Sequence, residues 1–326
     1  MHIPDGFLSG RVALGYAALS SLGIAAACYR LRAEQDRSNS ALLGVCAAFV
    51  FAAQMVNFPV LAGTSGHLVG GALAAALLGL PGAVVVMTAV LIVQCLMFAD
   101  GGLFALGANV FNLGLVGCVV GHCCYRLLCG DAPSPTRRVA AVAFAGWCAT
   151  LAGALSCAGQ LALSGAARLP VVLPAMLGVH ALIGVGEAVI SALVVASVLR
   201  FRPELLENVG ARLGARAPAS AVLVGLGLSV VVAALLAPLA YTAPDGLTRV
   251  LQSLGLRAST QTSPFAPLSE YGISAVVPAL LATVLAGCLG TLLLFSLCWL
   301  LARALVPRSL RASMPEASRV VVESSG

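Results

Sequence analysis

Only four histidines occur among the 326 residues, and one of them is His2. A free terminal amine, the amide nitrogen of residue 2 and the Nδ1 atom of its imidazole can bind one metal ion together, because they close a five-membered and a six-membered chelate ring. These three nitrogens lie nearly in one plane, and a fourth nitrogen completes a square. Square-planar nitrogen ligation is the geometry expected of Ni(II) or Cu(II). Pro4 offers no competing amide nitrogen and makes the turn after the chelate rigid. The chemistry requires that the amine of Met1 be unblocked.

His67 is the best candidate for the fourth ligand. It ends the sequence Gly63–His67 (GTSGH) at the start of a hydrophobic segment, on the side where we expect the N-terminus. His122 falls near the opposite end of its segment. His180 lies deeper within a segment and stays open as an alternative. A histidine at a helix start can also be only a hydrogen-bonding group, so chelation logic alone does not decide the role of His67.

The composition places this chemistry in a membrane. Apolar residues make up 60% of the chain, charged residues only 9%, and the mean hydropathy is +1.03. A soluble domain carries roughly 25% charged residues, so the sequence indicates an integral membrane protein. All 18 basic residues are arginines. Without lysine the chain has neither a Walker A motif nor Schiff-base chemistry, so ATP-driven transport would need hydrolysis by another chain.

We predict an all-α, polytopic membrane bundle of about nine transmembrane helices, seven followed by two. The hydrophobic segments cover residues 12–29, 41–56, 67–80, 82–98, 103–125, 139–163, 172–199, 218–240 and 273–302. The third segment is short, and Pro81 follows it directly. It is either a short full span or a helix packed deep against its neighbours.

The arginines predict the orientation of the bundle. With the N-terminus outside and nine crossings, all of the 18 arginines except Arg11, Arg168, Arg249 and Arg257 fall in inner loops or the inner tail. Because inner loops of membrane proteins are rich in basic residues, this asymmetry favours an outer N-terminus and an inner C-terminus. It also supports the third segment as a real crossing, since a miscount would destroy the alternation.

The spacing of the segments divides the chain into four regions. They are a first unit of seven spans (1–200), an arginine-rich inner linker (201–217), a second unit of two spans around a long outer loop (218–305, loop 241–272) and a polar, disordered tail (306–326). A cleaved signal peptide is a competing interpretation of residues 1–28, because the first apolar run ends in an alanine-rich stretch. The first ten residues, however, contain Asp5 and no basic region.

The first eight residues, MHIPDGFL, resemble the N-terminal signature of the CbiM/NikM family. Its members are the substrate-binding (S) components of energy-coupling factor (ECF) transporters for cobalt and nickel. The resemblance covers about residues 1–200 and continues through the stretches Gly63–His67, Gln94–Gly102, Gly107–Asn112 and His180–Glu187. In that family the terminal amine, the amide and imidazole of the second residue, and the histidine of the GTSGH motif hold the metal. The resemblance therefore implies that Met1, His2 and His67 are the metal ligands.

A second resemblance concerns Ala243–Leu247 (APDGL), which is similar to the PDGLE motif of the small CbiN/NikN subunit, although Thr248 stands where that motif has glutamate. The chain thus resembles a fusion of the two subunits. For Asp245 two roles stay open: a turn with an exposed carboxylate, or a loop that guides the N-terminal segment and loads the metal.

The two resemblances together imply a transporter subunit that imports Ni2+ or Co2+ as substrate, without a prosthetic group, across a bacterial plasma (inner) membrane. They imply as partners a CbiQ/NikQ-like coupling T component and CbiO/NikO-like ABC ATPases. A nucleic-acid partner is not expected, because the arginines are dispersed along the chain.

Polar side chains within membrane spans are costly and usually serve a purpose. Asn109 and Asn112 share one helix face, as do His180 and Glu187. These pairs either join helices by hydrogen bonds or support and gate the metal site. We expect the same supporting role of Asn57, Thr64, Ser65, Gln94 and Asp100.

Two other functions compete with metal import by an S component: a stand-alone secondary metal permease, and a non-transporting membrane metal sensor or scaffold. A proton-driven permease usually has paired acidic residues at mid-membrane depth and internal repeats. Here Glu187 is the one mid-span carboxylate, and no repeat is clear. Planar nitrogen ligation and the Irving–Williams order favour nickel over cobalt as the substrate.

Overall fold

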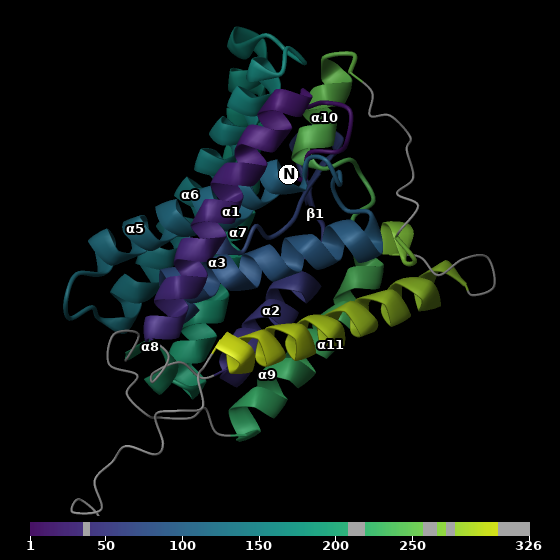
Figure 1. Ribbon diagram of the computed structural model, residues 1–326. Coiled ribbons are helices and arrows are strands. Elements are labelled where there is room, and N and C mark those ends of the chain that lie inside the picture. Colours follow the sequence, from purple (N-terminus) through teal and green to yellow (C-terminus); the bar gives the residue numbers. More distant parts are fainter. Residues whose placement is uncertain (35–39, 208–218, 257–265, 272–277, 306–326) are drawn as a thin grey trace, which may run out of the picture.

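The computed structural model describes residues 1–34, 40–207, 219–256, 266–271 and 278–305 (Figure 1). Most of the predicted linker 201–217, part of the loop 241–272 and the whole tail 306–326 lie outside the described residues. The elements in chain order are α1 (Gly10–Glu34), α2 (Ser40–Gln54), β1 (Phe58–Val60), η1 (Leu61–Gly63), β2 (Thr64–Gly66), α3 (Gly71–Phe98), α4 (Leu106–Asn109), η2 (Val110–Val116), α5 (Gly117–Cys129), α6 (Pro135–Leu163), α7 (Leu169–Phe201), α8 (Glu204–Glu207), α9 (Ala219–Val231), η3 (Val232–Leu236), η4 (Ala237–Leu239), α10 (Gly246–Ser253), η5 (Ser269–Tyr271) and α11 (Ala279–Leu305).

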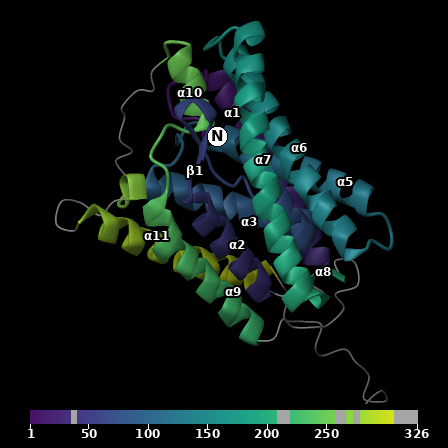
Figure 2. The same cartoon turned by 180° about the vertical axis from the view of Figure 1, so that it is seen from behind.

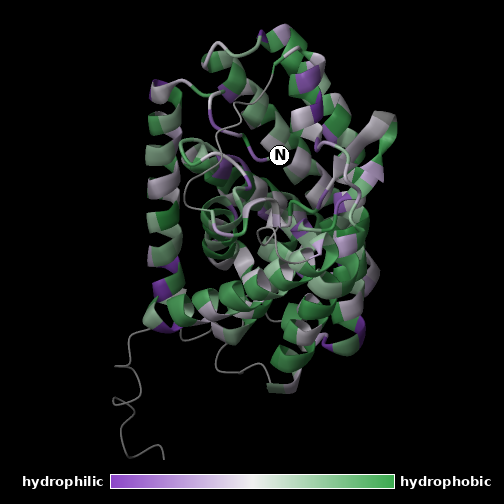
Figure 3. Ribbon diagram, turned by 90° about the vertical axis from the view of Figure 1, so that its right-hand side faces the viewer, coloured by the Kyte–Doolittle hydropathy of each residue, from purple (hydrophilic) through white to green (hydrophobic). Residues whose placement is uncertain are grey.

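Seven helices of the described chain are long and apolar enough to cross a membrane. They are α1, α3, the continuous helix from α4 to α5, α6, α7, the helix that begins with α9 and ends at Leu239, and α11. The apolar helix α2 is shorter, with 15 residues. Figure 3 shows hydrophobic residues along most of the helices and hydrophilic ones mainly near helix ends and connections. The prediction of a polytopic helical membrane protein is confirmed.

Helix α3 contains residues 71–80 of the third predicted segment and all of the fourth, and it breaks at Gly79, just before the point where we expected the two segments to meet. The φ of 75° and ψ of 169° at Gly79 are not helical, and glycine is the residue that tolerates this conformation. A straight helix of 28 residues would span roughly 42 Å. Yet His67, just before α3, and Asp100, just after it, both contact His2. The pieces on either side of Gly79 therefore fold back on each other.

A short antiparallel hairpin of β1 and β2 departs from the all-α prediction. Phe58 pairs with Gly66 and Val60 with Thr64, while residues 67–70, which we predicted as the start of a span, precede the helix. Strand β2 of the hairpin also pairs with a distant segment, because its Ser65 forms a parallel bridge with Asp245. The hairpin thus places the residues just before His67 against the start of α10.

The C-terminal helices α9 and α11 pack against α2 on one side of the bundle (Figures 1 and 2). Small residues allow this contact. A Cβ added at Gly44 would lie 2.7 Å from the carbonyl oxygen of Phe295, and one at Gly290 would lie 2.3 Å from the ring of Phe51. Close approach through small residues is how helices associate in lipid. The second predicted unit is therefore packed directly on the first.

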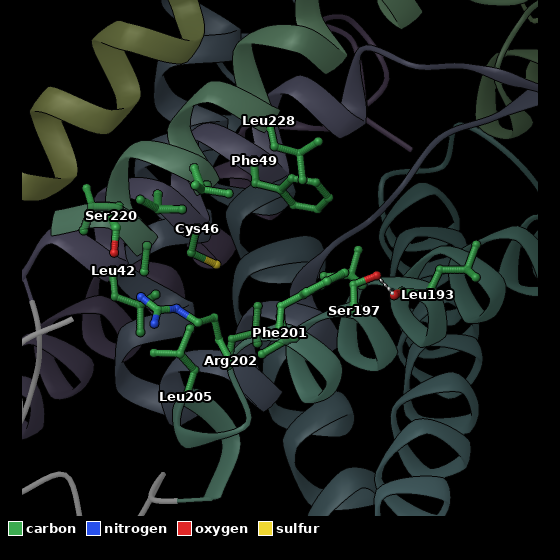
Figure 4. A pocket seen from close by; sticks show the side chains of 18 residues that line it. Leu42, Cys46, Phe49, Leu193, Ser197, Phe201, Arg202, Leu205, Ser220 and Leu228 are labelled. Carbon is green, nitrogen blue, oxygen red and sulfur yellow. Dashed lines mark hydrogen bonds between the residues drawn. The ribbon is translucent and has the colours of Figure 1, made fainter. Parts of the chain in front are cut away.

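A cavity of about 540 Å³ lies between α2, α7 and α9 (Figure 4). Its wall is mostly apolar, with side chains such as Leu42, Phe49 and Leu228, and Arg202 reaches in at one end. The residues that line it include neither a histidine nor a carboxylate. The metal chemistry expected from the sequence must therefore lie elsewhere.

Candidate metal centre

The N-terminal segment lies inside the protein, beside β1 and α10 in both ribbon views (Figures 1 and 2). Ile3 is fully buried. The side chain of Asn109 forms two hydrogen bonds with the main chain of Ile3, as a neighbouring β-strand would. Asn109 Oδ1 accepts from the Ile3 N–H at 2.8 Å, and Asn109 Nδ2 donates to the Ile3 carbonyl at 3.1 Å. Gly102 N–H donates to the same carbonyl at 2.9 Å. These bonds fix the backbone next to His2.

Asp5 holds the segment at its other end. Its carboxylate accepts hydrogen bonds from the backbone N–H groups of Leu103 (2.9 Å), Phe104 (2.9 Å) and Ala105 (3.2 Å), just before α4. A carboxylate satisfies the unpaired N–H groups of a helix start and interacts well with the helix dipole. Sequence reasoning did not predict this role of Asp5, because nothing local in the sequence indicates partners about 100 residues away.

The terminal amine of Met1 lies between His67 and Asp245. It donates to Asp245 Oδ2 at 2.8 Å and lies 3.2 Å from His67 Nε2, and Met1 itself is 3% exposed. Burial raises the pKa of the Asp245 carboxyl. The Met1 ammonium and hydrogen bonds from it and from Thr248 outweigh burial and hold that pKa below its ordinary range. Asp245 is therefore the counter-ion of the N-terminus.

His67 presents the nitrogen that a metal ligand needs. Its Nδ1 lies 2.9 Å from the Leu68 carbonyl oxygen, which can only accept, so Nδ1 carries the proton and the lone pair of Nε2 faces the Met1 amine. Burial first, and then the nearby Met1 ammonium, lower the pKa of His67 to about 4. The imidazole is therefore neutral at pH 7.

The imidazole of His2 stacks on that of His67, with ring centroids 5.6 Å apart and an angle of 11° between the planes. Its Nδ1 lies 3.1 Å from Asp100 Oδ1, and Tyr271 donates to the other Asp100 oxygen at 2.9 Å. Burial raises the pKa of Asp100, but the His2 charge and hydrogen bond outweigh it and hold that pKa below its ordinary range. The chelate expected from the sequence requires the His2 ring to turn from Asp100 toward the amine.

Glu187 supports the loop that carries His67. Its carboxylate, fully buried in α7, accepts from the backbone N–H groups of Val69 (2.5 Å) and Gly70 (3.0 Å). On the other side, Gln54 donates to the Val69 carbonyl at 2.9 Å, and Gln94 donates to Gln54 at 2.8 Å. The loop is therefore held through its main chain from two helices and cannot shift without breaking buried hydrogen bonds.

The start of α10 closes the centre from the second unit. Ser65 donates its N–H to the Pro244 carbonyl at 2.8 Å and its hydroxyl to the Ala243 carbonyl at 2.7 Å. Asp245 caps α10, since its Oδ1 accepts from the Thr248 N–H at 2.8 Å. The same carboxylate therefore caps a helix with one oxygen and holds the Met1 amine with the other.

Some predicted residues lie farther from the amine. Asn112 bonds with Gln160 (2.8 Å) and Ser156 (2.7 Å) in a group between η2 and α6. Asn57 contributes its main chain, whose carbonyl accepts from the Tyr241 N–H at 2.9 Å. Thr64 is buried in β2.

His180 lines a small cavity of about 10 Å³ together with Met1, Ser65, His67, Asp245 and Gly246. Tyr271 and Gln54, which sequence reasoning missed, enter through bonds to predicted residues.

Within the described residues, no three His, Cys, Asp or Glu side chains are arranged to hold a metal by themselves. What converges instead is a terminal amine, two imidazoles and two carboxylates around an N-terminal segment. The molecule is thus an integral membrane protein with a buried nitrogen-rich centre built on the end of its own chain.

The chain belongs to the family described as the cobalt uptake substrate-specific transmembrane region, whose model matches residues 2–205. Residues 219–306 match the PDGLE domain. The resemblance to the CbiM/NikM family with a fused PDGLE module is therefore confirmed.

Named relatives agree with this assignment. A protein of Archaeoglobus fulgidus named as a fused nickel transport protein, NikMN, is 41% identical over 210 residues, covering 64% of this chain and 68% of that one. The fused nickel transport protein NikMN of Rhodobacter capsulatus is 34% identical over 222 residues, covering 63% and 64%. A crystal structure of a transition metal transporter is 31% identical, covers 66% of this chain and 100% of its own, and has a TM-score of 0.56.

Proposed function

We propose that the chain is the substrate-binding membrane subunit of an ECF-type ABC transporter that imports transition-metal cations, with nickel favoured over cobalt. One observation carries this proposal: the Met1 amine lies 3.2 Å from His67 Nε2, and the His2 imidazole stacks on that of His67. Nitrogen donors 66 positions apart in the sequence are thus gathered at one buried point. Membership in a family of metal transport proteins supports a transporter rather than an enzyme.

The donor set is the Met1 amine, the amide and Nδ1 of His2, and Nε2 of His67. Because the described side chains form no three-residue metal cluster, main-chain nitrogens must complete the site. Four nitrogens in a plane suit Ni2+, and the Irving–Williams order ranks it above Co2+. When the ion replaces the proton on the amine, Asp245 loses its counter-ion and retains its bond to the start of α10.

Around these donors, Asn109, Gln94 and Glu187 act as positioning residues, because they bond the main chain or the neighbours of the ligands rather than the amine. Asp100 holds Nδ1 of His2 when no metal is bound, and Nδ1 must leave it to bind the ion. Ser65 and Asn57 hold the hairpin against the second unit, and Thr64, buried in β2, pairs with Val60 within the hairpin. Such supporting contacts typically change metal affinity 10–100-fold.

We further propose nine crossings, with the N-terminus outside and the C-terminus inside a plasma membrane. The fold-back of α3 at Gly79 supports this count, because it returns the chain to the side from which it entered, as a pair of crossings would. The last turns of α1, α5, α7 and α11 each contain an arginine, as inner helix ends should. The units are residues 1–200 and 218–305, joined by the linker 201–217, and the tail is 306–326. The metal centre then opens to the outer face.

The partners in this proposal are a membrane coupling T component and ABC ATPases of the CbiQ/NikQ and CbiO/NikO types. The chain needs them for ATP-driven import, because without any lysine it cannot form a Walker A motif. Uptake by this chain alone would instead favour the stand-alone permease.

Metal binding by purified protein tests the site. The full chain in detergent, titrated with Ni2+ and with Co2+ by equilibrium dialysis, should bind one ion per chain, with nickel tighter. The variant His67→Ala should lose high-affinity binding. The matched control His122→Ala, which removes a histidine of α5 away from the amine, should retain it. Equal losses in both variants would show that the ligand assignment is wrong.

Uptake in cells tests the transporter class. Radioactive nickel uptake should require this chain together with a T component and ABC ATPases, and should stop when the Walker lysine of the ATPases is replaced. Undiminished uptake with inactive ATPases would reject the ECF-type assignment.

A further inference from the structure

His180 repeats the arrangement of His67. It is 1% exposed within α7, and its Nδ1 lies 2.8 Å from the Met176 carbonyl oxygen. The carbonyl can only accept, so Nδ1 holds the proton and Nε2 carries the lone pair. Metal-binding histidines characteristically donate their other ring nitrogen to a carbonyl in this way. Among the described residues, nothing donates a hydrogen bond to His180 Nε2.

His180 belongs to the wall of the small cavity beside the amine. The same cavity is lined by Met1, His67, Asp245 and Gly246. A Cβ added at Gly246 would lie 3.1 Å from His180 Nε2 and 3.0 Å from the adjacent ring carbon. Glycine at the first position of α10 therefore permits the helix to approach the imidazole edge. A volume of about 10 Å³ is near that of one water-sized probe, and a metal ion is of comparable size.

We propose that His180 Nε2 is the entering ligand that makes metal exchange at the N-terminal centre fast. This inference rests on the proposed function. Ligand exchange at a square-planar ion is associative: a new donor attacks from above the plane before an old one leaves. A buried imidazole that shares a cavity with the amine and His67 supplies such a donor where water has little room.

Exchange through His180 forms one new bond to the ion before others break. A bond forms between the metal ion and His180 Nε2, which gives a five-coordinate ion. The bond to the His2 amide nitrogen then breaks, and that nitrogen takes a proton from solvent. The amine of Met1 likewise leaves the ion, takes a proton from solvent and returns to Asp245. The ion departs when its remaining bonds, to His67, the His2 imidazole and His180, break in exchange for incoming ligands. His180 thus acts on the rate of exchange, and the planar set of donors determines the affinity.

The test compares rate with affinity on the full chain in detergent, with Ni2+ as the probe. The variants are His180→Gln and His180→Ala, with His122→Gln as the matched control on α5. In both His180 variants the dissociation constant should stay within about threefold, while release of Ni2+ to an excess of chelator slows at least tenfold. Added imidazole should restore the rate in His180→Ala, because the truncated side chain leaves room for it, and should not accelerate the wild type.

Each other outcome overturns the inference. Wild-type release rates in both His180 variants would show that the residue takes no part in exchange. A large loss of affinity together with faster release of Ni2+ would make His180 a permanent ligand or a structural residue. Failure of the proposed function is recognised separately, because the wild type would then bind no Ni2+ or His67→Ala would bind it normally.

Discussion

At the scale of residues, the chemistry of the centre depends on what the Nδ1 atom of each histidine contacts, because that contact decides which ring nitrogen keeps a free lone pair. His67 and His180 direct Nδ1 to a backbone carbonyl and so present Nε2, whereas the Nδ1 of His2 faces Asp100. The terminal amine of Met1 is likewise held by a single carboxylate, that of Asp245, in a largely buried position. The state of these nitrogen atoms is therefore set by a few hydrogen bonds to main-chain carbonyls and to two carboxylates.

Blocking the terminal amine should abolish metal binding. A Gly–Ser extension before Met1 moves the amine away from His67 Nε2 and removes the ammonium that pairs with Asp245. We expect at least a 100-fold weaker affinity for Ni2+, measured by equilibrium dialysis. The same extension at the C-terminus is the control and should have no effect. High-affinity binding by the N-terminally extended protein would exclude the amine as a ligand.

Binding of Ni2+ at pH 7 should release protons from the terminal ammonium and the His2 amide, and none from His67. Because the pKa of His67 is lowered to about 4, its imidazole is already neutral above about pH 5. Affinity should therefore fall from pH 7 to 5 through proton competition at the other donors, which are the Met1 amine and the amide and imidazole of His2, with no contribution from His67. Calorimetry in buffers of different ionisation enthalpy counts the protons. Binding without proton release would instead indicate carboxylate ligands.

At the scale of elements, the site is positioned by short irregular segments that are held by long helices. The hairpin and residues 67–70 carry His67, and Glu187 of α7 and Gln54 of α2 hold their main chain. The start of α10 covers the amine. The helices fix the frame, and the non-helical segments between them carry the donors.

Glu187→Gln should weaken metal binding without changing the ligands. The carboxylate accepts two N–H groups with its two oxygens, whereas a glutamine has one acceptor and places an NH₂ group against the second N–H. We expect the affinity for Ni2+ to fall about 10–100-fold. Ser197→Ala on the same helix removes an exposed hydroxyl that bonds only within the helix and should be neutral. Equal affinity in both variants would show that the loop needs no such support.

Gly79→Ala should destabilise the fold. The φ of 75° with ψ of 169° is a conformation that a side chain makes costly, and the expected loss is about 1–3 kcal/mol, measured as a lower thermal midpoint. Gly159→Ala is the control, because that helical glycine has open space around it. A Gly79→Ala protein as stable as the control would argue against a strict backbone requirement at the bend.

Sequence patterns predicted the helices well and their contacts poorly. Hydrophobic runs placed α6 and α7 within a few residues of their observed bounds, because lipid demands long apolar segments. The hairpin was missed, since its strands have three residues each and carry no periodic signal. The partners of Asp5 and Glu187 are backbone N–H groups about 100 or more residues away, and every residue has such a group, so no side-chain pattern identifies them.

At the scale of the whole molecule, the two units share one centre. Asp245 of the second unit pairs with Met1 of the first, and Ser65 pairs with the strand-like segment that precedes α10. The arginines at the ends of α1, α5, α7 and α11 are consistent with a membrane that separates this centre from the inner face.

The topology can be read with reporter fusions. Alkaline phosphatase, which is active only outside the cytoplasm, should be active when fused after Gly165, between α6 and α7, and inactive when fused after Gly130, between α5 and α6. This pattern follows if α3 crosses the membrane twice. A single crossing by α3 with the N-terminus outside would reverse both results, and activity after both residues would refute either topology.

The pairing of Met1 with Asp245 joins residues 244 positions apart, and this separation has a consequence in time. A ribosome adds about 5–20 residues per second, so Asp245 is synthesised about 12 to 50 s after Met1. Until then the amine has no such carboxylate partner, and the enzymes that deformylate, trim or acetylate nascent chains act within this period. Whether Met1 keeps the free amine that pairs with Asp245 can therefore be settled before Asp245 is made.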